Sequence, residues 1–100
     1  MADRIRWGII GTGRMARLFA EGLRVLPDAE LVAVTDRVGA AAKAFAGEFV
    51  VGRVYERSEE LVADAGVDVV YIATPHARHK GDCLVCLGAG KAVIGQTGVD

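Results

Sequence analysis

The chain has 100 residues, of which 52% are hydrophobic and 25% charged, and its formal net charge at pH 7 is −1. This composition excludes a disordered chain, and the length allows one small domain with its own core. The balanced charge and the scattered basic residues give no sign of a nucleic-acid-binding surface, and no apolar run reaches the about 18 residues that indicate a membrane span.

Two features of the sequence predict its compartment. The first residues lead straight into an apolar run, so we expect no signal peptide. The two cysteines are then expected to be reduced thiols, which predicts a cytoplasmic protein.

The first half of the chain alternates apolar runs with helical patterns. An apolar strand is predicted over 5–10, followed by a glycine turn and a helix over 13–25. A second strand over 30–35 leads to a second helix over 38–48, whose apolar residues recur three or four positions apart. This alternation is typical of an α/β fold.

The second half of the chain continues the alternation. Strands and helices are predicted in turn over 53–55, 58–65, 68–73, 76–88 and 92–94. Ser58 is the expected N-cap of the helix over 58–65, and Gly66 is its expected C′ residue.

Five strands joined by helices predict a Rossmann-type parallel sheet in the order 3-2-1-4-5, with helices on both faces. The sequence contains no sixth strand, so the fifth strand is expected to form an exposed apolar edge. Self-association, or pairing with another chain, could use this edge.

The glycine turn Gly11-Thr12-Gly13 has the spacing G-x-G-x-x-A, which ends at Ala16. In a dinucleotide site the first glycine permits the tight turn, and the second lets a pyrophosphate approach the backbone. The helix that begins here presents amides with partial positive charge. The flanking strand and helix favour a dinucleotide site over a plain turn between a strand and a helix.

Asp36 follows the second predicted strand, 25 residues after Gly11. A carboxylate at this place accepts hydrogen bonds from the adenosine ribose and repels the 2′-phosphate of NADP. An ordinary surface acid is the alternative. Arg37 could instead pair with a 2′-phosphate, so NAD is favoured and NADP remains possible.

Thr74-Pro75-His76 ends the fourth predicted strand at the ligand-binding edge of the sheet, and His79 lies one helical turn further. We expect these residues to line the cofactor cleft; surface histidines are the alternative, and no further ligands complete a metal site.

The C-x-x-C pair at 83 and 86 lies in mid-helix among apolar residues. It is expected to be buried, with a thiol redox role as the alternative.

The motifs resemble the N-terminal domain of the Gfo/Idh/MocA oxidoreductases, and most of all the dihydrodiol and xylose dehydrogenase branch. The resemblance covers residues 4–94. Four stretches carry it: Arg6-Trp7-Gly8-Ile9-Ile10-Gly11-Thr12-Gly13, Val32-Ala33-Val34-Thr35-Asp36, Ile72-Ala73-Thr74-Pro75-His76 with His79, and Ala89-Gly90-Lys91-Ala92-Val93.

The resemblance implies a domain that binds NAD or NADP, in an enzyme whose second domain holds a sugar, polyol or diol for hydride transfer. It also assigns roles by position. The pyrophosphate would be held by Gly11, Thr12, Gly13, Arg14 and Met15, the adenosine ribose by Asp36 with Arg37, and the cleft toward the nicotinamide by Thr74, Pro75, His76 and His79.

The resemblance ends where the family normally reads Cys-Glu-Lys-Pro. Here the sequence reads Ile94-Gly95-Gln96-Thr97, so Thr97 stands where the family has its proton-transferring lysine. A neutral threonine has no pKa near 7 with which to act as an acid or base. We therefore expect residues 1–100 to be a dinucleotide-binding domain without the substrate domain, inactive alone. A non-catalytic nucleotide-binding or assembly module is the alternative.

Overall fold

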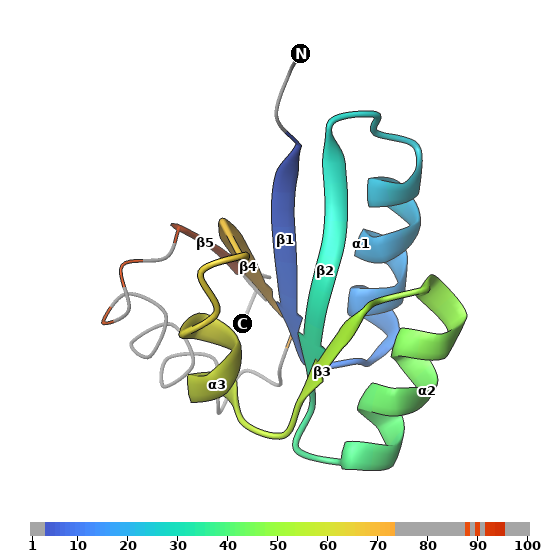
Figure 1. Cartoon of the computed structure of the whole chain (residues 1–100). Helices are drawn as coiled ribbons and strands as arrows, with labels where there is room; N and C mark the ends of the chain where they lie inside the picture. The colour runs from blue at the N-terminus through green and yellow to red at the C-terminus, as the bar shows by residue number, and fades with distance from the viewer. Residues whose placement is uncertain (1–3, 74–87, 89, 91, 96–100) are drawn as a thin grey trace.

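The computed structural model describes residues 4–73, 88, 90 and 92–95. Within these residues five strands form one parallel sheet in the order β3-β2-β1-β4-β5 (Figure 1), which confirms the predicted fold and strand order. The elements in chain order are β1 (Ile5–Ile10), α1 (Arg14–Arg24), β2 (Ala29–Thr35), α2 (Gly39–Phe49), β3 (Arg53–Tyr55), α3 (Ser58–Val62), β4 (Val69–Ile72) and β5 (Ala92–Gly95). The helix predicted over 76–88 lies almost wholly outside the described residues.

The sheet separates two hydrophobic clusters, because successive residues of a strand point to opposite faces. On one face Ile9 packs in a cluster with Ala16 and Ala20 of α1 and with Phe45 of α2. On the other face the next residue, Ile10, packs in a cluster that includes residues of α3. Figure 1 shows α1 and α2 together on one side of the sheet and α3 apart from them.

Three aromatic rings extend the α1 cluster toward β4. Phe19 of α1 stacks on Tyr71 of β4, with ring centroids 3.9 Å apart and planes 3° from parallel. The ring of Trp7 in β1 meets Phe19 edge to face at 5.1 Å. Burial raises the pKa of the Tyr71 hydroxyl above its usual value. These contacts fix α1 against the strands that carry the candidate site.

Helix α3 differs from its prediction at both ends. Its N-cap is Arg57 rather than Ser58, and Glu60 Oε1 accepts the backbone N–H of Arg57 at 3.1 Å. The helix ends at Val62 with Ala63 as C-cap, so Gly66 is not its C′ residue. The early end has a local cause. The Asp64 carboxylate accepts the N–H of Gly66 at 2.7 Å and holds the chain in a turn.

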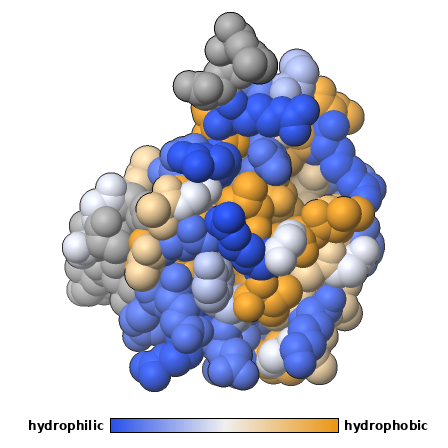
Figure 2. All heavy atoms as spheres, viewed as in Figure 1, coloured by the Kyte–Doolittle hydropathy of each residue, from blue (hydrophilic) through white to orange (hydrophobic). Residues whose placement is uncertain are grey.

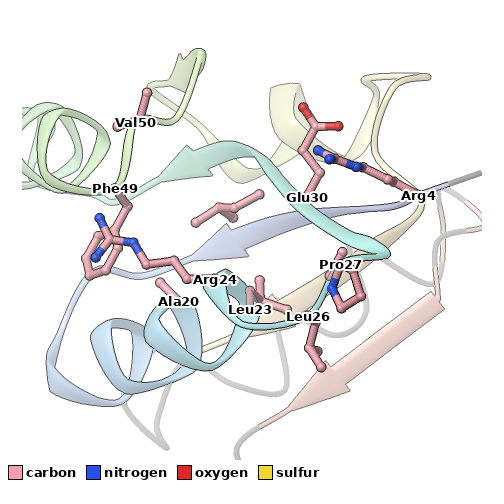
Figure 3. Close-up of a pocket in the computed structure, with 11 residues that line it drawn as sticks. Arg4, Ala20, Leu23, Arg24, Leu26, Pro27, Glu30, Phe49 and Val50 are labelled. Atoms are coloured by element: carbon pink, nitrogen blue, oxygen red, sulfur yellow. The ribbon is translucent and has the colours of Figure 1, made fainter.

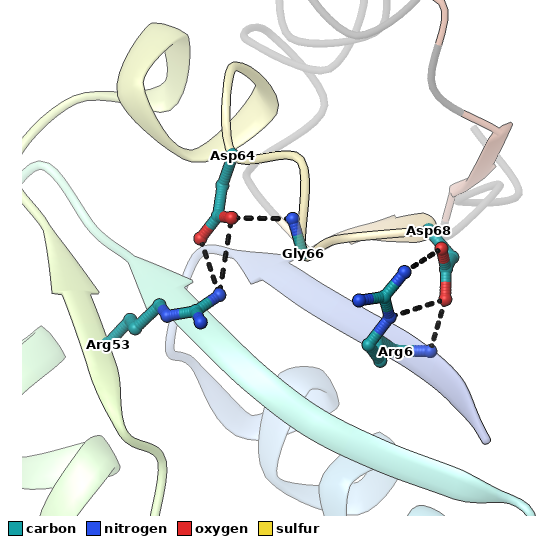
Figure 4. A network of polar contacts seen from close by, with 5 residues as sticks. All are labelled: Arg6, Arg53, Asp64, Gly66 and Asp68. Atoms are coloured by element: carbon teal, nitrogen blue, oxygen red, sulfur yellow. Dashed lines mark hydrogen bonds and ion pairs between the residues drawn. The ribbon is translucent and has the colours of Figure 1, made fainter. Parts of the chain in front are cut away.

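Two polar clusters connect neighbouring elements (Figure 4). The carboxylate of Asp64 joins the turn after α3 to β3, because it accepts Arg53 Nη1 at 2.9 Å and the Tyr55 hydroxyl at 2.7 Å. The pKa of Asp64 is lowered by these bonds, first by that from Tyr55, and the same bond raises the pKa of Tyr55. In the other cluster Asp68 Oδ1 accepts Arg6 Nη2 at 3.0 Å, joining the starts of β4 and β1.

The surface combines both kinds of residue. On the face shown in Figure 2, hydrophobic residues form a central band bordered by hydrophilic ones. Several large apolar side chains of the described chain are exposed, with Val25 and Val50 at 79% and 84% exposure. Single exposed apolar side chains of this kind are ordinary on a protein surface.

Candidate functional site

Three strands end at one edge of the sheet and form the floor of the candidate site. Ile10 at the end of β1 pairs with Thr35 of β2 on one side and with Ile72 of β4 on the other. Gly11 then donates its N–H to the carbonyl of Thr35 at 2.8 Å. The strand order therefore reverses around β1 at this edge, the switch point where α/β sheets bind ligands.

The glycine turn that follows β1 requires a glycine at its first position. Gly11 has φ 99°, a conformation that residues with a side chain rarely adopt. Thr12 is only 8% exposed, so the middle residue of the turn faces the protein. This part of the dinucleotide pattern thus has the backbone shape that the spacing predicts.

Gly13, the N-cap of α1, leaves an open approach to the helix. Its φ of −77° is available to any residue, and a Cβ added here would meet no atom within 4 Å. In the described chain no side chain caps α1, and its first turn contains no acidic residue. The first amides of α1 therefore present partial positive charge at an open place, which suits an anion.

Asp36 reaches the glycine turn from the end of β2. Its Oδ2 accepts two hydrogen bonds from Thr12, one from the backbone N–H and one from the hydroxyl, both at 2.8 Å. Its Oδ1 accepts the N–H of Val38 at 2.8 Å. The half-buried carboxylate thus places its negative charge beside the turn, on a different chain segment from the open amides of α1.

Of the other predicted site residues, the structure describes three and leaves four outside its described part. Arg14, Met15 and Arg37 are exposed and adjoin the turn or Asp36 in the sequence. Thr74, Pro75, His76 and His79 lie outside the described residues. Asp36 was predicted as a site residue from its position just after the second strand. The hydrogen bond that it accepts from the Thr12 hydroxyl was not predicted. A threonine between the two glycines was the available signal, because its hydroxyl can donate to a nearby carboxylate.

A hollow of about 320 Å³ lies at the opposite end of the strands, near the starts of β1 and β2 (Figure 3). It is lined near the starts of β1 and β2 by Arg4, Pro27 and Glu30, and near the ends of α1 and α2 by Arg24 and Phe49. The Arg24 guanidinium stands 4.9 Å from the centre of the Phe49 ring and covers part of the apolar wall. Because the glycine turn lies at the carboxyl edge, this hollow is separate from the candidate site.

The described residues hold no helix long and apolar enough to cross a membrane. They also contain no group of three histidine, cysteine or acidic side chains placed to hold a metal ion.

Comparisons with known proteins agree on one family. Residues 5–95 match the profile of the GFO_IDH_MocA family, described as an oxidoreductase family with an NAD-binding Rossmann fold. The chain is 44% identical over 92 residues to trans-1,2-dihydrobenzene-1,2-diol dehydrogenase of Sus scrofa, a match that covers 90% of this chain and 28% of that protein.

Solved structures of enzymes that bind a nicotinamide dinucleotide also match nearly the whole chain. Myo-inositol dehydrogenase from Lactobacillus casei, in complex with NAD(H) and myo-inositol, is 32% identical with a TM-score of 0.89, over 94% of this chain and 28% of that one. Biliverdin reductase from Synechocystis sp., in complex with biliverdin and NADP+, is 34% identical with a TM-score of 0.83, over 91% of this chain and 28% of that one. The chain thus spans less than a third of the length of each relative.

Proposed function

Because the chain belongs to the Gfo/Idh/MocA oxidoreductase family, as its NAD-binding Rossmann domain, we propose that the glycine turn at 11–13 and the start of α1 hold the pyrophosphate of NAD. The observation that carries this proposal is the open approach at Gly13, beside helix amides that no side chain caps in the described chain. A diphosphate there would accept hydrogen bonds from these amides and would meet the positive end of the helix. Arg14 and Met15, both exposed in the first turn, would flank it.

Asp36 is the proposed contact for the adenosine ribose. Among the described residues its Oδ1 accepts a bond from Val38 alone, so a lone pair remains with which it could accept a ribose hydroxyl. The fixed negative charge beside the turn disfavours a 2′-phosphate, so NAD is the proposed cofactor of this chain. Arg37 keeps NADP as the second candidate, and Thr74, Pro75, His76 and His79 remain the proposed lining toward the nicotinamide.

The proposed reaction of the full-length protein is hydride transfer from a CH–OH group of a sugar, polyol or diol. The relatives support this substrate class: the Sus scrofa enzyme is named for a trans-1,2-diol, and the Lactobacillus casei enzyme is complexed with myo-inositol. NAD supplies the hydride acceptor when it is bound. Thr97 replaces the lysine expected by resemblance, so we propose that residues 1–100 alone bind the cofactor without turning over substrate.

Assembly through β5 is the second candidate function. β5 forms one edge of the described sheet, and its Ile94 is 47% exposed. An edge strand with an apolar side chain can pair with a second copy or with another chain.

The cytoplasm remains the proposed compartment of the protein. The support for it is that the two cysteines are expected to be reduced thiols.

Thermal unfolding with and without nucleotide tests the cofactor proposal. At about 100 times its Kd, NAD should stabilise the protein by about 2.7 kcal/mol. Gly13→Ala should keep the ligand-free Tm, because its methyl group meets nothing, and should lose most of the NAD-induced shift, because that methyl occupies the approach of the pyrophosphate.

Gly22→Ala is the matched control for that variant. Gly22 lies in α1 as well, and a Cβ there also meets no atom within 4 Å, but it is far along the helix from the turn. It should keep the full NAD-induced shift. If neither NAD nor NADP raises the Tm of the wild type, the cofactor proposal is wrong and the assembly function is favoured.

A further inference from the structure

Three donors in the described part of the chain hold the Asp36 carboxylate. Thr12 supplies two of them, its backbone N–H and its hydroxyl, and both bond to Oδ2 at 2.8 Å. Val38 N–H supplies the third, to Oδ1 at 2.8 Å. A carboxylate that accepts several N–H and O–H bonds is held in one orientation.

These bonds leave Thr12 with no free donor. A threonine has one hydroxyl hydrogen and one backbone N–H, and Asp36 accepts both. The 8% exposure of Thr12 also keeps the residue turned toward the protein. Its position in the glycine turn suggests a phosphate contact, but its hydrogen bonds connect it to the carboxylate.

From this geometry we infer that Thr12 is a specificity-determining residue that positions Asp36 against a 2′-phosphate. The inference rests on the proposed binding of NAD at the glycine turn. While Thr12 holds Oδ2, the carboxylate keeps its charge beside the ribose site and offers Oδ1 to a ribose hydroxyl. A 2′-phosphate placed there would be repelled by that negative charge.

Loss of the hydroxyl bond should weaken this discrimination. Asp36 is only half buried, so a carboxylate with fewer donors can turn toward solvent and take its charge with it. The exposed guanidinium of Arg37 next to it could then pair with a 2′-phosphate without the opposing charge of Asp36. Thr12 therefore acts through Asp36 and is a positioning residue.

The experiment measures the Kd of NAD and of NADP by calorimetry for the wild type and four variants. Thr12→Val keeps the side-chain shape and removes the hydroxyl, so the ratio of the NADP Kd to the NAD Kd should fall by at least about threefold, the effect of losing part of one charge-assisted bond. Thr12→Ser keeps the hydroxyl and should stay within about twofold of the wild-type ratio. Asp36→Ala should lower the ratio most, and adding Thr12→Val to it should change the ratio no further.

Each outcome decides the inference. A Thr12→Val protein that loses affinity for both nucleotides equally, with the ratio unchanged, overturns it, because the hydroxyl would then serve the shared part of the ligands. A wild type that binds neither nucleotide overturns the proposed function, and this inference with it. If valine prevents folding, Thr12→Ala removes the same hydroxyl without the branched side chain and must meet the same criterion.

Discussion

The Tyr55 hydroxyl donates to Asp64 Oδ2 over 2.7 Å, and this bond is the main reason that the pKa of Asp64 lies below its ordinary value. The unfolded chain lacks the bond, so folding favours the charged carboxylate. The resulting stability is present above the unfolded pKa of about 4 and is lost as the pH falls through the lower folded pKa. We expect the free energy of unfolding, measured in urea from pH 6 to pH 2, to decline in that acid range.

Tyr55→Phe tests the origin of this decline. Without the hydroxyl the pKa of Asp64, followed by NMR, should rise toward its ordinary value, and the Asp64 contribution to the acid decline should shrink. At pH 7 the variant should lose about 1 kcal/mol of stability, the usual net contribution of such a bond. An unchanged Asp64 pKa would show that its other contacts, among them those from the Gly66 amide and Arg53, are enough to lower it.

Gly8→Ala should destabilise the fold, because β1 and α3 leave no room for a side chain at this position. A Cβ at Gly8 would stand 2.9 Å from Leu61 Cδ2 and 3.2 Å from Val67 Cγ1, and both of those side chains are buried. The crowding should cost about 1–3 kcal/mol. Thermal unfolding without ligand measures the loss as a lower Tm.

Gly47→Ala is the matched control for that prediction. Gly47 lies inside α2, and a Cβ there meets no atom within 4 Å. The same chemical change should therefore stabilise the protein by about 0.5–1 kcal/mol through helix propensity. A Gly8→Ala protein with a Tm equal to or above that of the wild type would contradict the close approach of β1 and α3.

Val50→Gly should stabilise the protein. Val50 has φ 57° and ψ 51° at the end of α2, in the left-handed conformation that strongly disfavours a β-branched residue, and it is 84% exposed. Relief of that strain should stabilise the folded protein by more than the extra entropy of glycine stabilises the unfolded chain. The free energy of unfolding should therefore rise by about 0.5–1 kcal/mol. Urea unfolding measures the gain. Val50→Ala keeps a Cβ in the strained conformation and should gain less; equal gains would attribute the effect to lost apolar exposure.

The parts of the fold that follow from apolar periodicity were predicted well. The bounds of β1 and β3 are those predicted, and the alternation of strands and helices, typical of a doubly wound sheet, predicted the strand order. The buried residues of α1, Ala16, Ala20 and Leu23, lie three or four positions apart, as one face of a helix requires. These features depend on which residues must leave water, and a sequence records that directly.

Features set by individual side chains were predicted poorly. Ser58 is a good N-cap residue, but Glu60 satisfies the amides before the helix and moves the cap to Arg57. Gly66 looks like the residue that ends a helix, but it leaves room for Arg53 and Asp64: a Cβ there would stand 2.5 Å from Arg53 Nη1. Both errors arise from contacts that residue preference alone does not encode.

The candidate site divides in the same way. The glycine turn was predicted from spacing, and the approach of Asp36 from the order of the elements, because both depend on the backbone path. The bonds from Thr12 and Val38 to Asp36 needed atomic positions. The left-handed Val50 gave no signal at all, since valine is among the residues least expected there.

The ring contacts between β1 and α1 give the domain a built-in optical probe. Trp7 is the only tryptophan of the sequence, and it touches Phe19 on the helix whose first turn forms the candidate site. Its fluorescence therefore reports on that helix from inside the native protein, with no label attached. Ligand titrations and unfolding curves of every variant can thus be followed through one intrinsic signal.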